Sequence, residues 1–257
     1  MSWWPRSRGK CGDWMKFVSY FFAALVAVLV AAPANAAGLA DWDAIVVAGD
    51  WHSHSGAPSE VFDNARRDIS ADLVRIGFSQ NNILQFSVQS AHYPGSEHSD
   101  KQTIANDLWD LSNRTTGGCL IYFTSHGSPD GIVLDEGVMS PSSMAAMIDN
   151  ACGSRPTVVF VAACFSGVFV DALSGPNRFV MTAARPDRPS FGCGDNDHYT
   201  FFDNCWLDSI GSTGDFSGLA NSIRACVSTK EHQIGALPSE PQLQIGANIA
   251  GELPRWR

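Results

Sequence analysis

The sequence lacks the cysteine and histidine spacings that bind most structural zinc ions or form redox-active dithiols. Seven cysteines occur among 257 residues, but no two are spaced as CxxC, and no HExxH motif is present. A thioredoxin-like protein, a zinc ribbon and an HExxH metallopeptidase are therefore not expected. The chain also lacks internal repeats and low-complexity segments, so we expect one ordinary catalytic or binding domain with a single core.

Basic residues are scarce as well. Lys and Arg together number 17, against 26 Asp and Glu, which gives a formal net charge of −9. Nucleic-acid binding depends on clustered Lys and Arg side chains that contact phosphates. Nucleic acid is therefore not an expected partner of this protein.

The first 36 residues follow the order of an export signal. A basic start precedes an uncharged, mostly apolar stretch at 17–32, and the small residues Ala34-Asn35-Ala36 come next. This order is typical of a secretory leader that is cleaved before Ala37. The alternative is an uncleaved membrane anchor, but the apolar stretch is short for a bilayer of about 30 Å, and a serine and a tyrosine interrupt it.

We therefore expect a signal peptide at 1–36 and a secreted or periplasmic domain at 37–257. Cleavage removes four basic residues and one acidic residue, so the net charge changes from −9 to −12. No stable membrane span is expected after cleavage.

Short apolar runs alternate with helical patterns through the middle of the chain. The runs are apolar almost throughout, which is typical of strands buried on both faces; they lie at 44–48, 83–88, 119–124, 157–163 and 179–183. Between them, apolar residues recur at steps of three and four, for example from Ser59 as N-cap to Gly77 as the C-terminal stop. The pattern predicts an α/β fold with a mainly parallel sheet covered by helices on both faces.

The later part of the chain is less regular. Residues 186–204 are rich in Gly, Asp and Cys, a helical pattern occurs around 216–226, and the remainder to residue 257 is loosely organised. A hairpin around 132–138 and a helix around 142–151 are also expected.

Two reactive side chains follow the third and fourth apolar runs. His126 lies in Ser125-His126-Gly127, and Cys164 begins the sequence CFSG. Neighbouring parallel strands lie about 4.8 Å apart, and sites form beyond their carboxyl ends. If the two strands are neighbours, the imidazole and the thiol can meet.

Acyl transfer by a thiol needs a nucleophile, a proton acceptor and hydrogen-bond donors for the oxyanion. Cys164 is the candidate nucleophile and His126 the candidate general base. Gly127 lets the backbone approach closely, so its N–H and that of Cys164 are candidates for the oxyanion hole. Either side chain alone is more often a buried Cys or a turn His, but the pair favours catalysis.

These residues resemble a known family. The sequences YFTSHGS (122–128) and ACFSG (163–167) are similar to the paired catalytic motifs of legumain-type cysteine peptidases, which are related to caspases. The sequences TAARP (182–186) and SFGC (190–193) resemble the segment that carries part of that family's substrate pocket. The resemblance spans roughly residues 44–210.

The resemblance implies a caspase/haemoglobinase-like three-layer sandwich. It also implies peptide or protein substrates, Cys-His catalysis without a metal or other cofactor, and the roles given above to His126, Gly127 and Cys164. Ser190 and Asp203 stand near positions that line the family's primary pocket, which is compatible with a polar or basic P1 side chain, and the sequence does not determine the P1 preference. For Asp203, a helix cap is the alternative role.

The sequence departs from the family at two positions. Ala162 stands two residues before the candidate nucleophile, where legumains typically have Glu, and no equivalent of their pocket arginine occurs between Asp50 and Asn64. Strict specificity for asparagine is therefore not expected.

The histidines of Trp51-His52-Ser53-His54 are a separate feature. A His-x-His pair can bind zinc, and His92 and His98 are further candidate ligands, but no cysteine pair accompanies them. Because the loop after the first strand borders the same sheet edge as Cys164, we expect His54 to line the site; an exposed loop histidine is the alternative.

The leading interpretation is an exported cysteine endopeptidase that acts through an acyl-enzyme at Cys164. One alternative is a transpeptidase or ligase of the same fold, in which an amine resolves the acyl-enzyme. Another is an exported binding protein with a silent site. If Cys164 is a free thiol, the five other cysteines outside the leader allow at most two disulfides, so at least one more stays unpaired.

Overall fold

The computed structural model describes residues 38–256, so the predicted leader lies outside the described residues. Within this part of the chain, no helix combines the length and the apolar character needed to cross a membrane.

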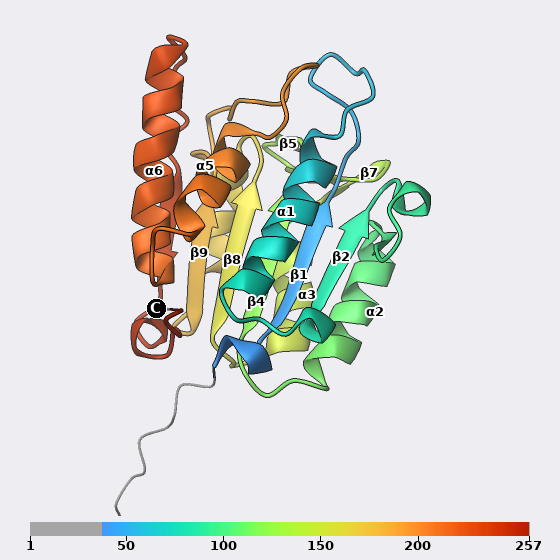
Figure 1. The fold of residues 1–257 in the computed structure, drawn as a ribbon, viewed down its shortest axis with the longest axis vertical. Coiled ribbons are helices and arrows are strands. Elements are labelled where there is room, and N and C mark those ends of the chain that lie inside the picture. Colours follow the sequence, from blue (N-terminus) through green and yellow to red (C-terminus); the bar gives the residue numbers. More distant parts are fainter. Residues whose placement is uncertain (1–37, 257) are drawn as a thin grey trace, which may run out of the picture. The chain divides into compact units, whose positions relative to one another are not determined.

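A seven-stranded sheet forms the centre of the described domain (Figure 1). Six strands run parallel, and the edge strand β10 is antiparallel to its neighbour. In spatial order the strands are β10 (Gln242–Ile245), β9 (Arg178–Thr182), β8 (Thr157–Ala162), β4 (Cys119–Thr124), β1 (Asp43–Ala48), β2 (Ile83–Ser87) and β3 (Glu97–His98).

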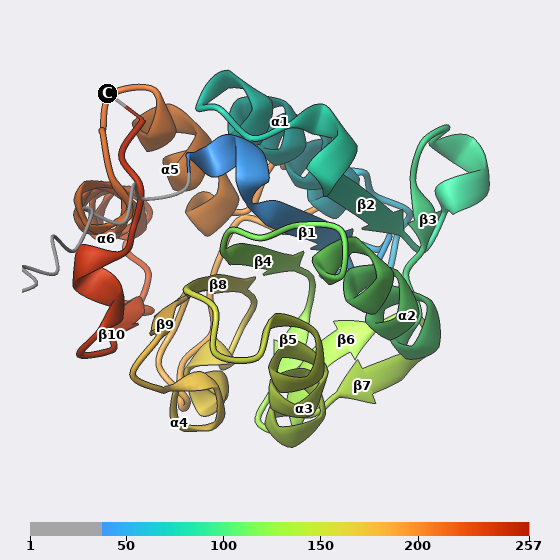
Figure 2. The same cartoon turned by 90° about the horizontal axis from the view of Figure 1, so that it is seen from below.

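Helices cover both faces of the sheet, as Figure 2 shows in a view from below. One face carries α1 (Val61–Arg75), α5 (Phe201–Ile210) and α6 (Phe216–Gln233). The other carries α2 (Lys101–Ser112), α3 (Pro141–Cys152) and α4 (Val170–Leu173). The predicted three-layer α/β architecture is confirmed.

Smaller elements complete the domain. A second, antiparallel sheet contains β5 (Gly127–Ser128), β6 (Gly131–Leu134) and β7 (Gly137–Met139), which confirms the expected hairpin. Single 3-10 turns are η1 (Leu39–Asp41), η2 (Gln80–Asn82), η3 (Ser90–His92), η4 (Ser166–Phe169) and η5 (Ile249–Gly251).

The central strands are apolar at almost every position because helices bury both of their faces. In β4, Leu120 and Tyr122 belong to the core on the α1 side, while Ile121 and Phe123 belong to the core on the α3 side. Successive side chains of a strand point to opposite faces, so a strand between two helical layers needs apolar residues at every position.

The sequence predicted most elements up to β9, and after β9 it predicted the helix that forms α6. The five apolar runs coincide with β1, β2, β4, β8 and β9 to within one or two residues. The helix predicted from Ser59 begins instead at Val61 with Glu60 at its N-cap position, although the Ser59 hydroxyl accepts the Val61 N–H at 3.2 Å. Helix α5 and strand β10 were not predicted.

Two disulfides cross-link the domain. Cys119 is bonded to Cys152, and Cys205 is bonded to Cys226. Cys164 and Cys193 are free thiols. This pattern agrees with the expected limit of two disulfides and with the expectation of a second unpaired cysteine.

Candidate active site

The candidate nucleophile and base follow two neighbouring strands at the same distance. Strands β4 and β8 pair in parallel, with Thr124 opposite Ala162 at their carboxyl ends. His126 comes two residues after Thr124, and Cys164 comes two residues after Ala162. The neighbouring strands that the site requires are therefore present, and both loops leave from one edge of the sheet.

The two loops pack directly on each other at Gly127. A Cβ atom built on this residue would collide with the carbonyl oxygen of Cys164 and would lie 3.0 Å from the Cβ of Ala163. Only glycine allows the backbone after His126 to come so close to the backbone of Cys164. This explains why the sequence has His-Gly at this point.

The imidazole of His126 is oriented by a backbone carbonyl. Its Nε2 atom lies 3.1 Å from the carbonyl oxygen of His52, and the Phe62 ring packs edge-on against it with 5.1 Å between centroids. A carbonyl only accepts hydrogen bonds, so Nε2 carries the proton. In the neutral ring, Nδ1 is then left with a free lone pair.

The loop that supplies this carbonyl is organised by Asp50, which directly follows Gly49 beyond β1. The Asp50 carboxylate accepts the backbone N–H groups of Trp51 and His52 at 2.6 and 3.1 Å, and it contacts Nδ1 of the His52 ring at 2.8 Å. The contribution of His52 to the site is its main-chain oxygen. Every residue has such an oxygen, so the sequence contained no signal for it.

The thiol of Cys164 lies against Ser190. The Ser190 N–H donates to Sγ at 3.3 Å, the Ser190 hydroxyl lies 3.7 Å from Sγ, and the thiol donates to the Ser190 carbonyl at 3.4 Å. The structure therefore brings the predicted residue Ser190 to Cys164, the candidate nucleophile. No hydrogen bond joins Cys164 to His126 within residues 38–256; such bonds often form only when substrate is present.

The turn after the nucleophile is tightly constrained. Phe165 has φ of 58°, in the left-handed region that non-glycine residues seldom adopt, and its N–H donates to the Arg188 carbonyl at 2.8 Å. The Ser166 hydroxyl accepts the Ala184 N–H at 3.1 Å, and a Cβ on Gly167 would collide with Pro186. The sequence CFSG is thus explained by contacts with the segment after β9.

The segment after Cys164 provides little helix dipole to stabilise a thiolate. It forms the 3-10 helix η4 and then the four-residue α4. A helix this short has a small macrodipole, so it adds little to the electrostatics of the thiol.

Residues 51–229 match the model of the Peptidase C13 family. The chain belongs to this family. Its legumain-type resemblance is therefore confirmed, and the protein is a cysteine peptidase. No curated protein sequence matches the chain.

The fold of this C13 peptidase is similar to that of a caspase. The crystal structure of caspase-1 from Spodoptera frugiperda superposes with a TM-score of 0.57 at 12% sequence identity, over 81% of this chain and 87% of that chain. At this identity the likeness shows the fold alone, and it confirms the caspase-like three-layer arrangement.

Asp203 of this C13 peptidase lies in the core, close to the edge of the sheet where β4 ends. It is fully buried, and its carboxylate accepts hydrogen bonds from the hydroxyls of Tyr122 at 2.7 Å, Thr124 at 2.6 Å and Thr200 at 2.8 Å. Desolvation by burial raises the pKa of Asp203 to about 6 from its ordinary 3.8. The N-cap of α5 is Thr200, and a contact of Asp203 with substrate stays a prediction.

His54 reaches the site through its backbone. Its side chain is exposed, and its N–H donates to the Cys193 carbonyl at 2.7 Å, which joins the loop after β1 to residues 190–193. A role of the His54 ring toward substrate stays a prediction. Burial, with the nearby Cys164 as a smaller cause, raises the pKa of Cys193 to about 11.

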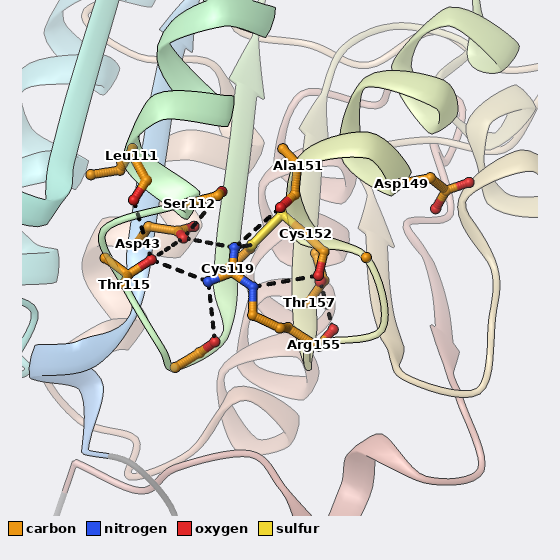
Figure 3. Close-up of a disulfide and its surroundings, with 12 residues drawn as sticks. Asp43, Leu111, Ser112, Thr115, Cys119, Asp149, Ala151, Cys152, Arg155 and Thr157 are labelled. Carbon is orange, nitrogen blue, oxygen red and sulfur yellow. Dashed lines mark hydrogen bonds and ion pairs between the residues drawn. A yellow bond between two sulfur atoms is a disulfide. The ribbon is translucent and has the colours of Figure 1, made fainter.

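The other histidines considered as zinc ligands have separate partners. His92 contacts Gln89 at 3.3 Å, and His98 contacts Asp135 at 3.3 Å. Among the described residues, the one group of three potential ligands is Asp43, Cys119 and Cys152 (Figure 3). Two of its members form a disulfide, and Asp43 and Cys119 start their strands, at the opposite end of the sheet from Cys164.

Proposed function

We propose that the protein is an exported endopeptidase that cleaves peptide bonds with Cys164 as nucleophile and His126 as general base. Nδ1 of His126 takes the proton of the thiol, and Sγ attacks the carbonyl carbon of the substrate. The N–H groups of Gly127 and Cys164 donate to the oxyanion that forms.

The reaction then proceeds through an acyl-enzyme. The protonated imidazole gives its proton to the leaving amine as the peptide C–N bond breaks, and the acyl group stays on Sγ as a thioester. His126 next takes a proton from water, whose oxygen attacks the thioester. The carboxylic product leaves, and the thiol regains its proton.

The observation that carries this proposal is the parallel pairing of β4 with β8. It gives His126 and Cys164 the same offset from paired strand ends, and their loops touch at Gly127. The bond from Nε2 to the His52 carbonyl supports Nδ1 as the base. Ser190, which contacts Sγ, is proposed to line the primary pocket, and Asp203, which accepts the Thr124 hydroxyl at the end of β4, is proposed to contribute to it.

The proposed compartment is secreted or periplasmic. The support is the leader-like sequence at 1–36 together with two disulfides in the described domain. Disulfides form and persist in oxidising compartments.

We predict that Cys164→Ala abolishes peptide cleavage while the domain stays folded, because the covalent path needs Sγ. The assay is cleavage of a random peptide library by residues 37–257, with products read by mass spectrometry. Hydrolysis adds one water across the broken bond, whereas an added amine is found in the product only if transfer occurs.

Cys193→Ala is the matched control, because it removes the other free thiol. It should retain cleavage, and both variants should unfold at temperatures near that of the wild type. Cleavage of the same bonds by the Cys164→Ala protein would refute the assignment.

A further inference from the structure

Arg188 lies within the wall of the candidate active site. Its carbonyl accepts the N–H of Phe165, the residue next to the nucleophile, and Ser190, two residues further on, contacts Sγ of Cys164. The backbone of Arg188 is therefore held beside the nucleophile turn. An arginine side chain extends about 6–7 Å from its Cα, the span of about two residues of extended peptide.

Arg188 is a half-buried cation without a carboxylate partner. Its Nε atom is buried and donates to no acceptor within residues 38–256, and no ion pair involves its side chain there. The other arginines of this part of the chain that are at least partly buried each pair with a carboxylate: Arg66 with Asp63, Arg155 with Asp43, Arg178 with Asp149 and Arg185 with Asp187.

The Nη groups of Arg188 are not among the buried atoms without a partner, and they make no hydrogen bond within the described residues, so they are the donors that a ligand can reach. The guanidinium stays protonated under all physiological conditions, so it cannot avoid the cost of burial by losing its charge. A buried N–H without an acceptor is destabilising. A carboxylate satisfies a guanidinium best, because its two oxygens match the planar donor fork.

We propose that Arg188 binds an acidic side chain of the peptide substrate, within about two residues of the scissile bond. This inference rests on the proposed function, since it takes the bond under attack to lie at Cys164. It assigns a preference for Asp or Glu at a position flanking the cleaved bond.

The net negative charge of the protein does not oppose this contact. The charge difference acts at long range, where salt screens it over a Debye length of about 8 Å. Arg188 acts at hydrogen-bonding distance in a partly desolvated wall, where a charge-assisted pair is strongest.

Peptide binding to the Cys164→Ala protein tests the inference without requiring turnover. The probes are matched libraries of ten-residue peptides with acetylated and amidated ends, in which one position is fixed as Glu or as Gln. We expect the Glu pool to bind about 10-fold or more tightly than the Gln pool at one fixed position, and Arg188→Gln to remove this difference.

Two further variants make the result specific. Arg185→Gln removes an arginine three residues away that already pairs with Asp187 and Glu240, and it should leave the Glu preference unchanged. Arg188→Glu should reverse the preference toward a Lys-fixed pool, and this gain of binding requires a folded protein.

The inference is overturned if the Glu and Gln pools bind Arg188-containing protein equally, or if Arg188→Gln keeps the difference. Cleavage of the Gln pool by the wild-type protein is a separate measurement. It reports on the peptidase proposal alone, so a failure of one proposal is distinguishable from a failure of the other.

Discussion

Burial near the end of β4 strongly raises the pKa of Asp203. Three hydroxyls donate to its carboxylate, yet desolvation prevails and raises its pKa to about 6, against an ordinary 3.8. The Asp203 carboxyl group therefore binds its proton more tightly in the folded protein than in the unfolded chain. Its contribution to stability is fully present below about pH 4 and is lost as the pH rises through 6.

We predict that Asp203→Asn flattens the dependence of the free energy of unfolding on pH between 4 and 7. The shift of pKa corresponds to about 3 kcal/mol, which the wild type loses over this range and the variant does not. Urea unfolding at a series of pH values measures it. Asp171→Asn, at an exposed position in α4, should give a curve parallel to the wild type. A parallel curve for Asp203→Asn would contradict the prediction.

At the residue scale, side-chain chemistry could be predicted and backbone chemistry could not. Cys164, His126, Gly127 and Ser190 were singled out from the sequence, and the structure brings their loops together. The His52 carbonyl that orients the imidazole was missed.

At the element scale, the Cys119–Cys152 disulfide joins the first residue of β4 to the last residue of α3, 33 positions apart. Arg155 strengthens the junction, because its guanidinium lies 3.0 Å from Sγ of Cys119 and pairs with the buried Asp43 at 3.0 Å (Figure 3). The starts of β1 and β4 and the end of α3 are thereby held together.

Replacing both Cys119 and Cys152 by alanine should lower the free energy of unfolding by about 3 kcal/mol. The cross-link restricts the unfolded chain, and its removal returns that conformational entropy. Denaturant unfolding under non-reducing conditions measures the loss. Cys193→Ala, which removes a thiol without a cross-link, should change stability less. A loss in the double variant no larger than in this control would count against the disulfide as a stabilising element.

Elements were predicted where burial imposed a period on the sequence. Strands β4 and β8 are buried on both faces, so nearly all of their residues are apolar and the sequence shows them as continuous apolar runs. Helix α5 is ten residues long and follows a loop rich in Gly and Asp, so its pattern was too short to distinguish from that loop. Strand β10 is a four-residue edge strand of mixed polarity, and only its pairing with β9 defines it.

At the scale of the whole molecule, acidic residues outnumber basic ones throughout the domain. Residues 37–257 contain 13 Lys and Arg against 25 Asp and Glu. We predict that this domain does not retard duplex DNA in a mobility assay at about 0.15 M salt, because it lacks the cationic surface that releases phosphate counterions. A shift that weakens as salt rises would contradict this.

The sequence by itself determined the α/β class and the family, and it supplied the candidate nucleophile and base. These follow from local information: runs of apolar residues, their period, and motifs within a few positions of one another. The order of strands cannot be obtained this way, because a parallel neighbour can come from any distant part of the chain.

Only the tertiary structure decided that β4 lies beside β8, which cysteines pair, and which cation is left without a carboxylate. Each of these features depends on which residues become neighbours in space, and those neighbours come from distant parts of the chain. Arg188 and Arg185 are the same residue type three positions apart, yet packing pairs Arg185 with two carboxylates and leaves Arg188 without one among the described residues.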